Sequence, residues 1–146
     1  MEIPYILTRP GAKAPAYATP GAAAADLCAA LDKPLTLAPG QRAIIPTGVA
    51  VQLPGPQWVA LLCARSGLAV KRGLTLSNGV GVIDSDYRGE IGAGVVNLGE
   101  EPVTVEPGER VAQLMILPVA QAAFVQAQSL DETDRGAGGF GSTGRL

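Results

Sequence analysis

The chain has 146 residues, is 47% hydrophobic and carries a formal net charge of −2. This length and composition indicate one compact domain with a buried core. Because the sequence contains no histidine, histidine-based catalytic triads are excluded, and zinc chemistry is disfavoured. The slightly acidic balance argues against a polyanion-coating protein, so we expect no direct nucleic-acid binding.

The first residues, Met1 to Tyr5, lack the basic flank and apolar centre of a signal peptide. No apolar run reaches the roughly 20 residues of a membrane helix. The two cysteines, Cys28 and Cys63, are far apart and are expected to be buried thiols in a reducing compartment. We therefore expect a cytoplasmic protein without membrane association.

Glycine (19 residues) and proline (12 residues) separate short runs rich in β-branched residues. Four such runs predict strands: Arg42 to Leu53, Trp58 to Cys63, Gly92 to Leu98 and Arg110 to Pro118. Nearly every candidate helix meets a glycine or proline before ten residues, and the alanine run 22–25 is the one local tendency toward a short helix. The pattern predicts an all-β fold, a jelly-roll-like β-sandwich or distorted barrel.

Two segments of the chain are similar to each other in sequence. Residues 34–43 (PLTLAPGQRA) match residues 102–111 (PVTVEPGERV). Proline followed by glycine presets a tight turn, so each segment predicts a strand, a turn and a second strand, forming a hairpin. The echo is too short to indicate duplicated domains.

The stretch Gly81 to Ile91 (GVIDSDYRGEI) places carboxylates, a tyrosine and an arginine between two apolar runs. A turn this rich in polar chemistry predicts a functional site. The C-terminal stretch Arg135 to Gly144 has five glycines, one arginine, one aromatic residue and two hydroxyls. Glycine-freed amides and hydroxyls can wrap phosphates, and an aromatic ring can cover a base. We expect one domain over residues 1–134 and a flexible glycine-rich lid over residues 135–146.

Five ordered blocks resemble the trimeric dUTPase family, over almost the whole chain. They are Ala24 to Leu27, Arg65 to Ala69, Asn78 to Ile91, Gly108 to Gln113, and the glycine-rich tail. Two positions depart from the family pattern: an alanine replaces the usual glycine before Asp26, and Ala64 replaces the usual proline before Arg65. Both changes keep small residues and leave the reacting groups intact.

The resemblance implies hydrolysis of dUTP to dUMP and pyrophosphate, which limits uracil incorporation into DNA and supplies dUMP for dTMP synthesis. It implies that Asp84 is the general base for a water attacking the α-phosphorus. Tyr87 would exclude a 2′-hydroxyl, and Asn78 would bind the uracil edge beside main-chain groups of Val82 and Ile83. The implied phosphate-end residues are Arg65, Ser66, Gly67, Gln113, Arg135, Gly141, Ser142 and Thr143, with Phe140 over the base, and Ser66 and Gln113 are also implied catalytic residues.

The resemblance further implies a single Mg²⁺ on the triphosphate, held mainly by substrate oxygens. Asp26 would act through metal-bound water or by orienting Arg65, and a turn-capping role competes with both. A homotrimer is implied, with active sites between subunits. Two alternatives stay open: a dCTP deaminase on the same fold, distinguished by base preference, and a catalytically silent jelly-roll oligomer that binds dUTP or a protein partner.

Overall fold

The computed structural model describes residues 1–139, which contain eleven strands and one short helix. The strands are β1 (Tyr5–Leu7), β2 (Ala25–Cys28), β3 (Leu35–Leu37), β4 (Arg42–Pro46), β5 (Val49–Val51), β6 (Trp58–Ala64), β7 (Leu74–Leu76), β8 (Gly81–Ile83), β9 (Gly92–Asn97), β10 (Val103–Val105) and β11 (Arg110–Pro118). The helix is α1 (Ser66–Arg72). The expected strands over 42–53, 58–63, 92–98 and 110–118 are confirmed, the first of them divided into β4 and β5.

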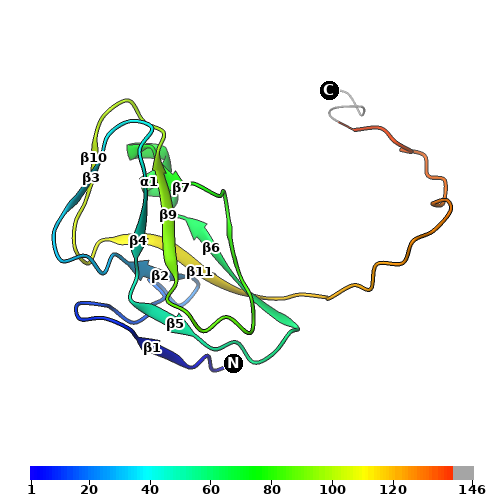
Figure 1. Cartoon of the computed structure of the whole chain (residues 1–146), viewed down its shortest axis with the longest axis horizontal. Coiled ribbons are helices and arrows are strands. Elements are labelled where there is room, and N and C mark those ends of the chain that lie inside the picture. The colour runs from blue at the N-terminus through cyan, green and yellow to red at the C-terminus, as the bar shows by residue number, and fades with distance from the viewer. Residues whose placement is uncertain (140–146) are drawn as a thin grey trace.

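The strands form a jelly-roll β fold, which confirms the all-β prediction (Figure 1). Two larger sheets provide the frame: one has the order β2-β11-β6-β8 and the other β4-β9-β7. Two strand pairs, β1-β5 and β10-β3, complete it. All pairings between these strands are antiparallel.

One apolar core lies between the sheets because alternate strand residues point inward. In β6 the buried residues are Ala60 and Leu62, and the other residues of the strand are half-buried. Leu27 of β2 and Ile45 of β4 are completely inaccessible to solvent. The opposite face of β6 and β11 is therefore free to carry polar side chains.

The echoing segments do not form two hairpins, so that prediction is wrong. Each does make the expected Pro-Gly turn, with Gly40 and Gly108 at φ 78° and 76°. However, β3 pairs with β10, and Thr36 lies opposite Thr104, with a 2.8 Å hydrogen bond between the two hydroxyls. After each turn the chain enters a different sheet, because β4 pairs with β9 and β11 pairs with β2 and β6. Turn chemistry fixes the reversal, and tertiary packing chooses the partner.

The alanine run 22–25 does not form a helix, because Ala25 begins strand β2. The helix forms instead at Ser66–Arg72, where basic residues in the last turn and Gly73 at φ 71° complete a left-handed C-terminal cap. A Cβ atom on Gly73 would lie 2.4 Å from the nitrogen of Gly99. Glycine is required there both by the backbone angle and by the neighbouring chain.

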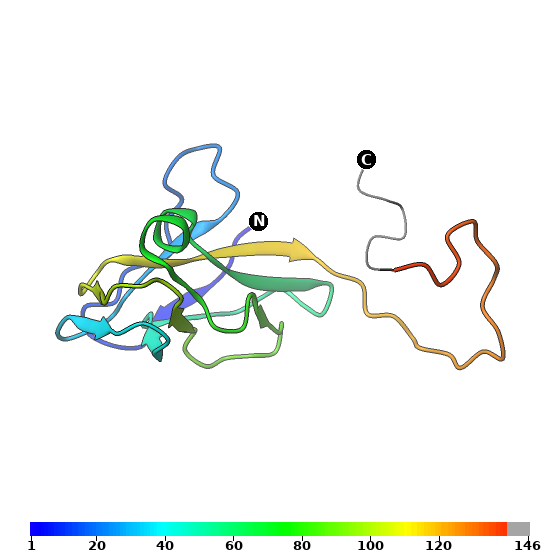
Figure 2. The same ribbon diagram turned by 90° about the horizontal axis from the view of Figure 1, so that it is seen from above.

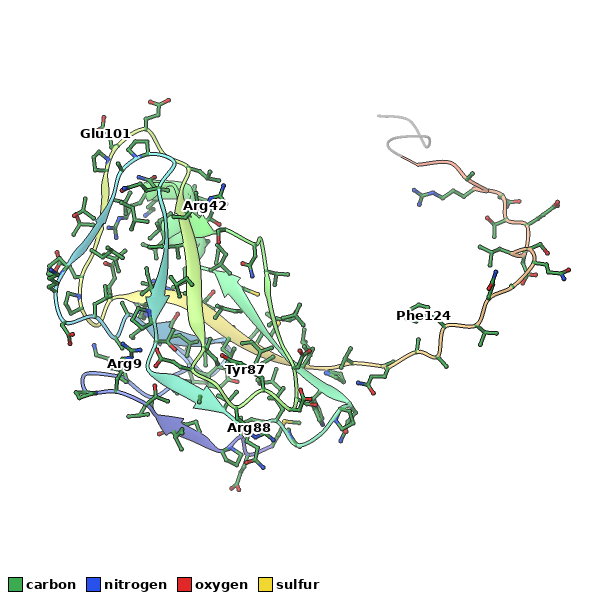
Figure 3. The ribbon with its side chains drawn as sticks, in the orientation of Figure 1. Arg9, Arg42, Tyr87, Arg88, Glu101 and Phe124 are labelled. Carbon is green, nitrogen blue, oxygen red and sulfur yellow. The ribbon has the colours of Figure 1, made fainter. Side chains whose placement is uncertain are left out.

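After β11 the chain leaves the body as an extended segment (Figures 1 and 2). Phe124, Val125 and Leu130 on this segment are 99%, 85% and 90% exposed. Figure 3 shows Phe124 far from the packed strands. Among the residues that the structure describes, no helix is long and apolar enough to cross a membrane.

Candidate active site

A row of polar side chains crosses the outer face of the four-stranded sheet. The strand register places Asp26 opposite Gln113 on β11, and Gln113 opposite Cys63 on β6. Their neighbours Leu27 and Ala112 are fully buried in the core. Asp26 and Gln113 therefore project together from the other face.

Asp26 is the centre of this row. It is only 5% exposed, and its carboxylate accepts a 3.0 Å hydrogen bond from Arg65 Nε on one oxygen and a 3.0 Å bond from Arg110 Nη1 on the other. Gln113 Nε2 donates to the first oxygen at 3.3 Å. One carboxylate thus holds two guanidinium groups and an amide, and the group retains a positive charge suited to an anion. We call Asp26, Arg65, Arg110 and Gln113 the Asp26 cluster.

Ser66 and Gly67 follow Arg65 directly and begin helix α1. Both are exposed, and a Cβ atom on Gly67 would meet no other atom within 4 Å. The carbonyl of Arg65 accepts bonds from Leu68 and Ala69, which fixes the start of the helix. The Ser66 hydroxyl and nearby main-chain amides are consequently presented beside the Asp26 cluster.

A separate cavity of about 250 Å³ lies along strand β8. Its lining residues are Leu62, Asn78, Gly81, Val82, Ile83, Asp84, Tyr87, Glu90, Ile91, Gly92 and Gly94. Three of these residues are glycines, and a Cβ atom on Gly81, Gly92 or Gly94 would lie 3.0, 2.8 or 3.1 Å from a neighbouring side chain, so the walls pack closely behind them. The volume suits a small ring system with a few polar contacts. We call it the β8 cavity.

The turn Asp84–Tyr87 stands at the mouth of this cavity. It is closed by a 3.2 Å hydrogen bond from the Tyr87 amide to the Asp84 carbonyl. The Asp84 side chain is exposed, and the Tyr87 residue is 45% exposed. A carboxylate and an aromatic ring therefore reach the same opening, where a ligand can meet both.

Glu90 also lines this cavity. Its carboxylate accepts bonds from Thr8, from Arg9 and from the main-chain amide of Gly48. Burial raises the pKa of Glu90, but these hydrogen bonds and the charge of Arg9 outweigh burial, so the pKa lies below its ordinary value. The carboxylate is thus held ionised.

The structure brings the site residues expected from the sequence into two groups rather than one. Asn78, Val82, Ile83, Asp84 and Tyr87 line the β8 cavity, whereas Arg65, Ser66, Gly67 and Gln113 do not line it. Arg135 lies after the last strand, is exposed, and donates to the Gly138 carbonyl. The expected contacts of Phe140, Gly141, Ser142 and Thr143 lie outside the described residues.

Asp26 is the residue that the sequence associates with a metal ion. No group of three or more histidine, cysteine, aspartate or glutamate side chains within residues 1–139 could hold a metal ion. Both oxygens of Asp26 already accept bonds from arginine. The donor chemistry therefore suits a Mg²⁺ ion whose ligands come mainly from a bound polyphosphate and water.

Sequence reasoning did not assign three features of these groups. Arg110 donates to the same carboxylate as Arg65, a role that the sequence does not assign to it although it lies in the block Gly108 to Gln113. Glu90 stands within the recognised stretch 81–91, but its partners are 42 to 82 residues away in sequence. Gly92 and Gly94 line the β8 cavity, and their spacing of two on one strand is the sequence signal that places them on one face.

A jelly roll that presents a cationic cluster suited to phosphate and a glycine-lined cavity suited to a ring belongs to the class of nucleotide-binding β proteins. The dUTPase family profile matches residues 11–144. The chain belongs to the dUTPase family.

Curated relatives and solved structures resemble nearly the whole chain. The chain is 56% identical over 144 residues to a deoxyuridine 5′-triphosphate nucleotidohydrolase of Desulfitobacterium hafniense, which covers 99% of this chain and 95% of that protein. It is 52% identical over 131 residues to the protein of that name in Aeromonas hydrophila, covering 90% and 86%. The structure of Staphylococcus bacteriophage 80alpha dUTPase with dUpNHpp superposes with a TM-score of 0.90 at 28% identity and 99% coverage of both chains.

Proposed function

We propose that this chain hydrolyses dUTP to dUMP and pyrophosphate, with Asp84 as the general base for a water that attacks the α-phosphorus. The observation that carries the proposal is the exposed Asp84 carboxylate at the mouth of the β8 cavity, beside Asn78 and Tyr87. A carboxylate can activate water only if it is within reach of the substrate and stays ionised. The relatives named for dUTP hydrolysis support the choice of substrate. The reaction would limit uracil incorporation into DNA and supply dUMP for dTMP synthesis.

Base recognition would use the open edge of β8. Within residues 1–139, β8 is the last strand of its sheet and pairs only with β6. Main-chain groups of Val82 and Ile83 on the other edge can therefore bond to uracil, alongside the Asn78 amide. A site with several such groups leaves them unpaired when a wrong base enters, and this penalty gives selectivity. Tyr87 would lie against the deoxyribose and leave no room for a 2′-hydroxyl.

The Asp26 cluster would bind the phosphates. Arg65 and Gln113 are oriented by Asp26, and Ser66 and Gly67 present a hydroxyl and main-chain amides beside them. Arg135 and the tail residues Phe140, Gly141, Ser142 and Thr143 would close over the substrate as a lid formed by residues 135–146. Charge-assisted bonds of this kind contribute about 1.5–3 kcal/mol each.

Mg²⁺ would be held by oxygens of the triphosphate and by water. When bound, it would neutralise charge on the phosphates during hydrolysis. In this arrangement Asp26 orients Arg65 rather than binding the metal directly, since both of its oxygens have arginine partners.

The active unit would be a homotrimer whose sites lie between subunits. Three observations support it. The residues of the Asp26 cluster do not line the β8 cavity of the same chain, and the tail exposes Phe124, Val125 and Leu130. The outer face of the four-stranded sheet also carries partly exposed apolar residues, Leu61 opposite Met115 and opposite Val82. Apolar surface of this kind is stabilised by contact with another copy.

Release of pyrophosphate from dUTP, dCTP, dTTP and UTP, each with Mg²⁺ and with chelator, tests the reaction. Release confined to dUTP and strengthened by Mg²⁺ is expected. Ammonia from dCTP would indicate the deaminase, and dUTP binding without release would indicate a binding protein. Asp84→Asn should keep nucleotide binding and lose turnover; normal turnover would remove Asp84 as the base.

Mixing two inactive variants tests whether sites span subunits. Asp84→Asn damages the residues of the β8 cavity, and Arg65→Met damages the Asp26 cluster. If each site takes these groups from different copies, trimers refolded from an equal mixture have both groups intact in about a quarter of their sites, because each group is intact with probability one half. If both groups come from one chain, mixing restores no activity.

A further inference from the structure

The Glu90 carboxylate joins three segments that are distant in sequence. Its Oε2 atom accepts bonds from Thr8 Oγ1 at 2.6 Å and from Arg9 Nε and Nη2 at 3.1 and 3.0 Å. Its Oε1 atom accepts the Gly48 amide at 3.1 Å. The side chain therefore links the N-terminal segment, the turn between β4 and β5, and the loop after β8. We call this contact the Glu90 junction.

The junction has little freedom to shift. Gly48 has φ 67°, and a Cβ atom there would lie 2.3 Å from Cβ of Ala12. The next residue, Ile91, is bonded on both sides: its amide donates to the Val49 carbonyl at 2.8 Å, and its carbonyl accepts the Thr47 hydroxyl at 2.6 Å. Thr47 is completely buried. The backbone at residues 90–91 is consequently fixed from the N-terminal half of the chain.

Tyr87 depends on this backbone for its position. Its hydroxyl donates a 3.0 Å hydrogen bond to the Glu90 carbonyl. At 45% exposure the residue is not held by core packing. A Cβ atom on Gly89 would lie 2.4 Å from the Tyr87 hydroxyl oxygen and 2.6 Å from Cζ, so the ring lies directly against the chain at Gly89. Figure 3 labels both Tyr87 and Arg9 in the lower half of the packed body.

We propose that Glu90 is a positioning residue for sugar selection: its carboxylate ties the loop to Thr8, Arg9 and Gly48, and its main-chain carbonyl holds the Tyr87 ring. The proposal rests on the proposed function, in which Tyr87 excludes the 2′-hydroxyl. Exclusion by contact requires the ring to stay in place, because a displacement of about 1 Å opens the space that an added hydroxyl needs. The N-terminal segment, which is distant in sequence from Asp84, thereby sets which sugar is accepted.

Glu90→Gln tests the proposal directly. The amide retains the shape of the side chain but has only one acceptor oxygen, so it cannot accept from Thr8 and Arg9 on one side and from the Gly48 amide on the other. We expect the ratio of kcat/KM for dUTP over UTP to fall roughly three- to tenfold, the change that loss of one ordinary hydrogen bond produces. The loss should come from a raised KM for dUTP and better use of UTP. A general loss of stability would not move this ratio.

Thr104→Val is the matched control. It removes the hydrogen bond to Thr36 between β3 and β10, at the opposite end of the molecule in Figure 1. Its dUTP/UTP ratio should equal that of the wild type. An unchanged ratio in Glu90→Gln would overturn the proposal, as would an equal fall in Thr104→Val.

Two further variants keep the proposal testable if Glu90→Gln does not fold. Arg9→Met removes one partner of the carboxylate from an exposed position, and Gly89→Ala pushes directly on the Tyr87 ring. Both should lower the ratio. Tyr87→Phe removes the bond to the Glu90 carbonyl, so Arg9→Met should have little added effect in that background. Ratios like that of the wild type in both Arg9→Met and Gly89→Ala would refute the proposal.

The outcome is separable from the proposed function. If the wild type releases no pyrophosphate from dUTP, the proposed function fails. If the wild type is selective for dUTP and the junction variants are equally selective, the function stands and the role of Glu90 fails.

Discussion

Replacing Asp26 by asparagine distinguishes an orienting carboxylate from a metal-binding one. Asparagine keeps one acceptor oxygen but turns an NH₂ group toward the second guanidinium, so Arg65 and Arg110 cannot both keep their bonds. The Asp26 and Arg65 side chains are 5% and 24% exposed, so loss of this charge-assisted bond costs about 1.5–3 kcal/mol. Arg110 is 52% exposed and screened by water, which limits its share to about 0–1 kcal/mol.

The summed loss is roughly 1.5–4 kcal/mol of unfolding free energy. For a chain of this size, about 3 °C of Tm per kcal/mol gives a decrease of roughly 5–12 °C. Melting should be followed at equal chain concentration, with Mg²⁺ and with chelator, because assembly affects Tm. Asp32→Asn, an exposed aspartate in the loop before β3, is the matched control and should melt like the wild type.

Activity supplies the second readout. Arg65 and Gln113 lose their common anchor, so kcat/KM for dUTP should fall at least about tenfold. The Mg²⁺ concentration giving half-maximal activity should stay unchanged, because Asp26 is not a metal ligand in this arrangement. A Tm within about 2 °C of the wild type would refute the anchoring argument. A strongly raised Mg²⁺ requirement with normal stability would assign Asp26 to the metal.

Three other predictions follow from local geometry. Gly48→Ala should destabilise the fold by several kcal/mol in urea titration, through a positive φ and contact with Ala12, whereas Gly67→Ala, at an open position, should not. Glu90 has a folded-state pKa below its unfolded value, so its stabilisation is present above the unfolded pKa and lost as the pH falls through the folded pKa. Between roughly pH 6 and pH 3 the wild type should therefore lose more stability than Glu90→Gln, and parallel curves would contradict this. Truncation after Asp134 should abolish most dUTP hydrolysis while the remaining chain melts at the wild-type temperature. An unaltered rate of hydrolysis would show that residues 135–146 do not act as a lid.

The strands were predictable because their signals are local. The runs 58–63, 92–98 and 110–118 combine β-branched residues with flanking Gly, Pro or Asn, and each forms a strand near the expected bounds. Helix α1 is not predicted because it is only seven residues long and contains Gly67, a residue typical of turns. Its C-terminal signal, basic residues before Gly73, was nevertheless present in the sequence.

Pairing partners were not predictable from local signals. The Pro-Gly turns at Gly40 and Gly108 form as expected, yet β3 pairs with β10 across 68 residues instead of with its neighbour β4. The same turn is compatible with β3 pairing with β4 or with β10. The burial of Leu37 and Val105 in the shared core favours the pairing with β10. Likewise, the sequence identified Asp26 by resemblance but could not show that Arg65 and Arg110 meet on it.

Two carboxylates with similar surroundings explain how exposed functional groups are held in place. Asp84, Ser66 and Tyr87 are exposed, as groups that must meet a substrate have to be, so core packing cannot position them. Asp26 and Glu90 instead gather donors from segments 39 to 87 residues away and fix the backbone or side chains beside those groups. Each carboxylate converts a long-range fold contact into local rigidity. Substitutions at Asp26 and Glu90 should therefore reduce catalysis or selectivity more than their distance from the reacting atoms suggests, and the two effects should be additive because the carboxylates share no partner.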